Sequence, residues 1–438
     1  MKALYQNQPA VPLTAVSLVL PRTGVCLEPP GLQGVTRLAL RMIFRGAGAF
    51  SNEEYNSRLE RLGATVGAGL GSDYVSFKML TLTDNLDQAL ELFALALDEP
   101  RFDSGEFERL QGELISSWKF DRQESKRLRA LEVYHREIYQ GRPQGYLSDG
   151  TLEGLQAAGL DDVRAQFRLL RETGRPVVAM VSNLPREELL EKVSARLGAT
   201  VQTGPEEGRE QSPHPWDDFE PPVPAGRRVV IIPDRDTNTD EIILGAFSTA
   251  QTDPQWHLHQ LIELVFGGDM NSRLFRIIRG ERGLSYGASC WYEAGRGRTP
   301  RNQRAPFTLY TFPSAEHTAQ AVPLLLEMYE ELVRWGITPE ELERARMARI
   351  NSHPFHRDTP QKLLNLALEE LLYGVRVDDE ESNRKKLEAV DAGDLLKAIR
   401  KDHDPRRALL VMLGDPERLL PIAESLPDME KIEEMEYP

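Results

Sequence analysis

The spacing of hydrophobic and polar residues predicts alternating strands and helices along the first hundred residues. Period-two alternation over YVSFKMLTL, residues 74–82, is typical of a strand, and the apolar run TAVSLVL, residues 14–20, favours a buried one. Residues 35–44 and 84–100 carry the apolar spacing of amphipathic helices. Ser51 and Glu54 form a capping-box pattern at the start of a further helix over 51–63. This order predicts helices packed on a mostly antiparallel sheet.

The second half of the chain repeats the pattern of the first. VVAM at residues 177–180 matches LLVM at 409–412, and IYQG ending at Gly141 matches LLYG ending at Gly374. IFRG ending at Gly46 matches VFGG ending at Gly268. Such matches at similar separations indicate duplication. We therefore predict an α+β protein of two homologous α/β halves.

A linker is expected at the midpoint of the chain. The stretch GPEEGREQSPHPWDDFEPPVPAGRR, residues 204–228, is rich in proline and charge and is unsuited to regular structure. We place the linker at 206–225, between an N-terminal half over 1–205 and a C-terminal half over 226–438.

Composition excludes several classes of protein. A net charge of −15 over 438 residues argues against a nucleic-acid partner, which basic surfaces bind. Cys26 and Cys290 provide neither a disulfide framework nor metal-ligand spacing, and we expect two buried, reduced thiols. The apolar run from Ala15 to Leu20 is too short for a signal peptide or a membrane span. We expect a cytoplasmic protein without membrane association.

One short stretch carries an unusual pair of charges. GVTRLALRMIFRG, residues 34–46, places Arg37 and Arg41 at positions i and i+4, which are neighbours on one helix face. Like charges at this spacing destabilise a helix by a few tenths of a kcal/mol. The pair therefore calls for an explanation beyond helix stability.

The stretch from Gly34 to Leu82 resembles the opening of the pitrilysin and mitochondrial-processing-peptidase family of inverted zincins, whose signature is H-x-x-E-H. The resemblance extends over essentially the whole chain and implies two homologous halves that form half of a clam-shell. It places the first His on Arg37, the Glu on Leu40 and the second His on Arg41. The third metal ligand of the family, a Glu on a later helix, falls on Ser117, and Glu113 lies four residues before it.

These replacements remove the metal chemistry that the resemblance implies. A guanidinium offers no lone pair to zinc, and Leu40 has no group that accepts a proton. We therefore expect no zinc and no cofactor in this chain, and no peptide hydrolysis by the chain alone.

The second half retains a different part of the family pattern. SRLFRIIRGERGLSYGASCWY, residues 272–292, places Arg279 and Tyr286 seven residues apart. In the family, such a pair holds the substrate backbone and the developing oxyanion, as two hydrogen-bond donors are suited to do. The alternative is a well-packed corner between a helix and a strand. Arg276 and Arg282 flank the pair and are alternative candidates for the arginine.

Two functions of different classes are consistent with this pattern. The first is the non-zinc subunit of a heterodimeric metallopeptidase, which lends Arg279 and Tyr286 to a homologous zinc-bearing partner that cleaves peptides. Bacterial members of the family occur as such pairs. The second is a non-catalytic scaffold or peptide-binding protein of the same fold. The sequence leaves open which peptides bind and whether the chain forms a homodimer when its partner is absent.

The histidines, an arginine-rich loop and the C-terminus are interpreted from their own local sequence. Five histidines, His257, His259, His353, His356 and His403, lack metal-ligand spacing and are expected at the surface or at helix ends. The arginine-rich loop at 293–306 is either a solvated hairpin tip or a basic patch for an acidic partner. The acidic C-terminus, MEKIEEMEYP, is expected to fray.

Overall fold

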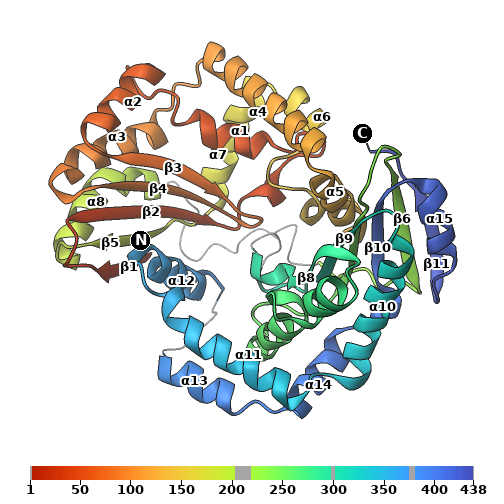
Figure 1. Cartoon of the computed structure of the whole chain (residues 1–438). Helices are drawn as coiled ribbons and strands as arrows, with labels where there is room; N and C mark the ends of the chain where they lie inside the picture. The colour runs from red at the N-terminus through yellow and green to blue at the C-terminus, as the bar shows by residue number, and fades with distance from the viewer. Residues whose placement is uncertain (1, 203–218, 297–300, 374–379, 438) are drawn as a thin grey trace. The chain divides into compact units, whose positions relative to one another are not determined.

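The computed structural model describes residues 2–202, 219–296, 301–373 and 380–437 (Figure 1). Most of the predicted linker and Arg298 of the arginine-rich loop lie outside these ranges. The strands are β1 (Lys2–Asn7), β2 (Leu13–Pro21), β3 (Thr65–Leu70), β4 (Tyr74–Leu82), β5 (Val177–Ser182), β6 (Arg227–Pro233), β7 (Glu241–Phe247), β8 (Ser285–Tyr292), β9 (Pro306–Pro313), β10 (Leu409–Gly414) and β11 (Met429–Glu434).

The helices include two π-helical segments, η4 (Leu264–Gly268) and η5 (Phe275–Glu281). The α-helices are α1 (Val35–Met42), α2 (Asn52–Arg61), α3 (Leu86–Asp98), α4 (Ser104–Glu124), α5 (Lys126–Ile138), α6 (Leu152–Ala157), α7 (Leu160–Thr173), α8 (Arg186–Gln202), α9 (Trp256–Glu263), α10 (Thr318–Trp335), α11 (Pro339–Ser352), α12 (Pro360–Tyr373), α13 (Glu380–Glu388), α14 (Ala392–Asp402) and α15 (Pro416–Glu424).

The chain forms two compact units, each built around one sheet. Unit 1 comprises residues 1–120, 146–218 and 356–377, and unit 2 comprises 121–145, 219–355 and 378–438. The sheet of unit 1 has the order β1-β5-β2-β4-β3, and that of unit 2 has the order β11-β6-β10-β7-β9-β8. The strands of unit 2 other than β11 follow the same order as those of unit 1: β6 corresponds to β1, β10 to β5, β7 to β2, β9 to β4 and β8 to β3.

Strand directions also agree between the two units. β1 is parallel to β5 and β6 is parallel to β10, whereas β2, β4 and β3 and their counterparts β7, β9 and β8 pair antiparallel. Equal strand order and direction are expected of a duplicated unit, because insertions accumulate in loops and leave the pairing intact. The predicted fold class, α+β with two homologous halves, is confirmed.

Both faces of each sheet are covered by helices. In unit 1, Phe77 of β4 lies opposite Leu18 of β2 and contacts Phe167 of α7, whereas Val19 of β2 faces Leu364 of α12. Successive strand residues point to opposite faces, so α7 and α12 lie on opposite sides of the sheet.

The sheet of unit 2 has the same two-sided arrangement. Val229 and Ile231 of β6 pack with α9, α10, α14 and α15, whereas Val230 and Ile232 pack with α5. The strands β6 and β10 therefore bury side chains on both faces, which explains their continuous apolar sequences.

The two units exchange a helix. α12 follows the linker in sequence but packs on β1 and β5 of unit 1, and α5 precedes the linker but packs on β7 and β10 of unit 2. The two helices are equivalent in the repeat, since they end within the matching IYQG and LLYG segments. Each compact unit is thus assembled from both halves of the sequence, while the predicted boundaries at 206–225 stay a prediction.

The acidic C-terminus departs from the expectation that it frays. Residues Met429–Glu434 form β11, parallel to β6, and Arg228 of β6 pairs with Glu433 at 3.2 Å. The amide of Gly226 donates to Glu430 at 2.8 Å, and Ile432 packs against the core of unit 2. The prediction was wrong because these cross-strand partners are distant in sequence.

Candidate functional site

The helix that carries the replaced metal positions, α1, begins with an unusual cap. Gly34 at its N-cap has φ of 106°, and no side chain of its own satisfies the first amides. The half-buried Glu28 does so instead, because its carboxylate accepts from the amides of Gly34 at 3.0 Å and Thr36 at 2.9 Å. Burial raises the pKa of Glu28 to about 7, although both hydrogen bonds oppose the shift.

Arg37, Leu40 and Arg41 occupy one short segment of α1 but have different environments. Leu40 is buried, Arg37 is half-buried and Arg41 is exposed. Arg41 lies in the last turn of the helix, where the helix dipole favours a positive charge. The helix therefore accommodates the arginine pair, with the dipole partly offsetting the repulsion between the charges.

Glu113, the carboxylate four residues before Ser117, pairs with an arginine. Glu113 of α4 accepts from Arg45 at 2.6 Å, just beyond the end of α1, and Ser117 lies one turn further along α4 and is exposed. The hydrogen bond from Arg45 holds the pKa of Glu113 below its ordinary value, and the charges of Arg109 and Arg41 act in the same direction. The carboxylate of Glu113 is therefore already paired with an arginine.

These residues do not fit zinc. Guanidinium groups stand at both histidine positions, and Ser117 stands where the third ligand is expected. Across the described parts of the chain, no group of three or more His, Cys, Asp or Glu side chains is arranged to hold a metal ion.

Two of the five histidines are buried: His403 caps the C-terminus of α14, a helix-end position as expected, whereas His259 lies inside α9, contrary to the expectation. His259 of α9 and His403, which follows α14, both hydrogen-bond to the hydroxyl of Tyr292, at 3.2 and 2.8 Å. The other ring nitrogen of His403 contacts the hydroxyl of Tyr329 at 3.1 Å, and His259 pairs with Asp402 at 3.3 Å. Burial lowers the pKa of His403 to about 3. His403 is therefore neutral and belongs to a hydrogen-bonded core network.

Arg279 and Tyr286 lie together on unit 2. The Cζ atom of Arg279 is 4.3 Å from the centre of the Tyr286 ring and 4.8 Å from that of Phe275, which is cation–π geometry. Tyr286 is 73% exposed. The spacing of seven residues thus brings a guanidinium and an accessible phenol side by side.

Local backbone irregularities position both members of the pair. Arg279 lies in the π-helical segment η5, where the amide of Arg282 donates to the carbonyl of Ile277 at 2.9 Å. Tyr286 lies in a register shift of β8 between Ser285 and Ala288. Single π-turns and β-bulges are enriched at functional sites, where they redirect side chains.

The two flanking arginines are placed differently. Arg276 is exposed and pairs with Glu281 at 3.0 Å, and Arg282 is also exposed. The cation–π contact with Tyr286 is made by Arg279. On geometry, Arg279 is the arginine that belongs with this tyrosine.

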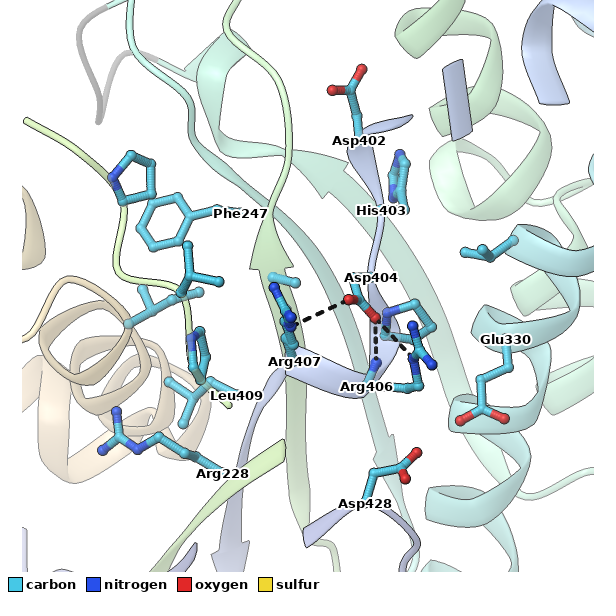
Figure 2. A pocket seen from close by; sticks show the side chains of 18 of the residues that line it. Arg228, Phe247, Glu330, Asp402, His403, Asp404, Arg406, Arg407, Leu409 and Asp428 are labelled. Carbon is cyan, nitrogen blue, oxygen red and sulfur yellow. Dashed lines mark hydrogen bonds and ion pairs between the residues drawn. The ribbon is translucent and has the colours of Figure 1, made fainter. Parts of the chain in front are cut away.

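A cavity of about 910 Å³ opens elsewhere on unit 2 (Figure 2). Its wall carries Asp404, which accepts from the amide of Arg406 at 3.2 Å and pairs with Arg407 at 3.5 Å. Arg228 and Glu330 also line it and have partners of opposite charge. Because its charges are largely balanced within the wall, the cavity shows no preference for a ligand of one sign. No sequence pattern indicated it.

The arginine-rich loop is described only in part. Arg301 hydrogen-bonds to the side chain of Gln251, and Arg304 donates to the carbonyl of Ser248 at 2.6 Å. These two arginines thus contact unit 2 itself. Cys26 and Cys290 are both buried, as expected, and they are not joined in a disulfide. No helix in the described ranges is long and apolar enough to cross a membrane.

Family sequence models match both halves of the chain. Residues 2–147 match the model described as insulinase, peptidase family M16, and residues 158–349 match the M16 peptidase inactive domain. The chain belongs to the M16 peptidase family. The match to the inactive-domain model, together with a relative named as a non-peptidase homolog, supports an inactive member of the family.

Its M16 relatives include proteins named as peptidases and a protein named as a non-peptidase. A protein of Bacillus subtilis named uncharacterized zinc protease YmxG is 22% identical over 348 residues, which cover 79% of this chain and 80% of that protein. The non-peptidase homolog YmxG of Helicobacter pylori is 20% identical over 406 residues, covering 92% and 89%. An M16 inactive-domain structure from Pseudomonas fluorescens superposes with a TM-score of 0.81 at 20% identity, covering 94% and 95%, and this likeness supports the fold.

Proposed function

We propose that this chain is the non-zinc subunit of a heterodimeric M16 metallopeptidase. It pairs with a homologous subunit that carries an intact H-x-x-E-H motif, completes the chamber and lends Arg279 and Tyr286 to the substrate. The observation that carries the proposal is the exposed Tyr286 stacked on Arg279, in a chain whose own metal positions hold no metal ligand.

The chemistry assigned to the pair is hydrogen-bond donation. The partner's zinc supplies the activated water, and this chain supplies two donors. Arg279 holds the substrate backbone, and the hydroxyl of Tyr286 donates to the carbonyl oxygen on which negative charge develops. Donors already in position lower the barrier because they need no reorganisation during the reaction. The cation–π contact keeps the phenol from rotating away.

The test is Tyr286→Phe in the pair reconstituted with a zinc-bearing M16 homologue. The variant retains the ring that stacks on Arg279 and lacks only the hydroxyl. Turnover should fall by about 10²- to 10³-fold, the usual cost of losing one oxyanion donor, with the amount of complex unchanged in size-exclusion chromatography. Tyr146→Phe, which removes a hydroxyl from unit 1, is the matched control and should retain full turnover.

Full activity of both Tyr286→Phe and Arg279→Ala in an intact pair would contradict the proposal. The scaffold or peptide-binding alternative would then be favoured, because a scaffold does not require the two donors.

A further inference from the structure

The pair Arg279 and Tyr286 is one end of a longer row of side chains on unit 2. The ring of Tyr286 lies 6.4 Å from that of Phe312, and Phe312 stacks on Tyr310 at 5.6 Å. At the far end, the Cζ atom of Arg127 lies 4.3 Å from the centre of the Tyr310 ring. We call Arg279, Tyr286, Phe312, Tyr310 and Arg127 the aromatic row. It runs between two arginines.

The strands and α5 build this row. Tyr310 and Phe312 are two residues apart on β9 and therefore share a face of the sheet, next to the edge strand β8 that carries Tyr286. The hydroxyl of Ser285 accepts from the amides of Gly287 at 3.3 Å and Phe312 at 3.2 Å, which holds the bulge of β8 against β9. Tyr286 is exposed and Phe312 half-buried, whereas Tyr310 is buried and the exposed Arg127 lies over its ring.

The charges at the two ends are unusual in a chain with a net charge of −15. Among the described residues, no carboxylate forms an ion pair or hydrogen bond with Arg127 or Arg279; the buried Glu241 influences Arg127 only at longer range. Arg127 also lies in the first turn of α5, beside Lys126, where the helix dipole disfavours positive charge. Both arginines therefore retain capacity for an acidic ligand.

The spacing of the rings matches an extended peptide. Side chains on one side of an extended strand recur about every 6.8 Å, close to the 6.4 and 5.6 Å between successive rings of the row. Apolar or aromatic side chains at alternate positions of a peptide can thus contact the exposed ring of Tyr286 and the half-buried ring of Phe312, while the buried ring of Tyr310 supports the exposed Arg127. An acidic residue beyond either end of that segment reaches an arginine.

We infer that the aromatic row is a binding track for extended peptides that carry aromatic or apolar side chains at alternate positions and acidic residues at the flanks. This inference rests on the proposed function for its site and deepens it by naming the substrate class. Phe312 and Arg127 are its new specificity-determining residues. Arg127 comes from the helix that the N-terminal half contributes to unit 2.

Binding to the purified full chain tests the track without the partner. Three labelled ten-residue peptides are titrated by fluorescence anisotropy: one with alternating aromatic residues and acidic flanks, one with lysine flanks, and one with alanine at the aromatic positions. The first peptide should bind most tightly, and its affinity should weaken with added salt. Equal affinities for the three peptides would overturn the inference.

Two substitutions test whether the peptides bind at the aromatic row. Arg127→Gln should weaken the affinity for the acid-flanked peptide about 2- to 5-fold, as expected for an exposed ion pair. The affinity for the lysine-flanked peptide should stay unchanged or increase. Phe312→Leu retains an apolar side chain, so the fold should persist in thermal unfolding, and it should weaken binding about 2- to 10-fold through loss of ring contacts. Arg235→Gln and Phe355→Ala replace exposed residues of unit 2 outside the row and serve as matched controls.

The outcomes separate this inference from the proposed function. If Tyr286→Phe abolishes turnover of the pair while Arg127→Gln and Phe312→Leu leave peptide affinity unchanged, the track is refuted and the proposed function stands. If the row governs peptide affinity but the reconstituted pair keeps full turnover with Tyr286→Phe, the track stands and the lent oxyanion donor is refuted.

Discussion

At the scale of single residues, the expected absence of zinc chemistry depends on a few side chains of α1 and α4. We predict that the purified chain binds no stoichiometric zinc and hydrolyses no peptide alone, because Arg37, Arg41 and Ser117 provide no ligand set. Mass-spectrometric metal analysis and a peptidase assay check this. One tightly bound zinc per chain would contradict it.

The triple variant Arg37→His, Arg41→His and Ser117→Glu is the positive control for that measurement. α1 already holds positions 37 and 41 one turn apart on the same face, so two imidazoles there should converge on one ion. Zinc bound by this variant and absent from the unmodified chain would support the alignment of the metal positions.

Glu28 makes the stability of unit 1 depend on pH. Its pKa is raised from 4.5 to about 7 in the folded chain, so between these values the folded state binds the proton more tightly than the unfolded state. The contribution of Glu28 to the free energy of unfolding should therefore decrease as pH rises from about 4.5 to about 7. Glu28→Gln should lack this dependence.

Urea unfolding at pH 5, 6, 7 and 8 gives the free energy of unfolding of the unmodified chain and of Glu28→Gln. As pH rises, the stability of the unmodified chain should fall relative to that of Glu28→Gln. The exposed Glu53 of α2 offers the control Glu53→Gln, for which the difference should be nearly constant. A constant difference for Glu28→Gln as well would contradict the assigned pKa.

At the scale of elements, the capping box of α2 was predicted from sequence and is present. The hydroxyl of Ser51 accepts from the amide of Glu54 at 3.3 Å, and the Glu54 carboxylate accepts from the amide of Ser51 at 2.8 Å. Ser51→Ala should lower the free energy of unfolding by about 1 kcal/mol.

The control is on the same helix. Ser57 lies inside α2, where alanine is a better helix former than serine, so Ser57→Ala should leave stability unchanged or slightly higher. Denaturant unfolding of both variants checks the prediction. Equal losses from the two substitutions would show that the cap contributes nothing specific.

At the scale of the whole molecule, the exchanged helices determine how the chain can be divided. A fragment of residues 1–205 lacks α12 and therefore exposes Val177, Ala179 and Val181 of β5. A fragment of residues 226–438 lacks α5 and therefore exposes one face of β6 and β10. We predict that neither fragment unfolds cooperatively by itself. Co-expressed, the two should form a complex, because each supplies the helix that the other lacks.

Calorimetry of the separate and co-expressed fragments tests this prediction. The intact chain provides the reference transition. A cooperative transition of either isolated fragment at the temperature of the intact chain would show that the exchanged helix is dispensable for that unit.

The sequence by itself determined the features that depend on neighbouring residues. Period-two alternation located β4 and a continuous apolar run located β2. The apolar spacing located α1 and α3, and the capping box located the start of α2. The pairing of Arg37 with Arg41 followed from the 3.6-residue turn of a helix. The repeated segments indicated two homologous units, which the common strand order confirms.

Only the tertiary structure decided the features that depend on residues far apart in the chain. It placed α5 and α12 on sheets from the opposite half of the sequence, buried His259 and His403 in a network with Tyr292, and made the acidic C-terminus a strand. It also brought Arg127 to Tyr310, almost two hundred residues away in the sequence. The spacing of residues along the chain sets whether a segment forms a helix or a strand. Which helices and strands then pack together depends on the burial of entire apolar faces, and residues from both halves of the chain contribute to those faces.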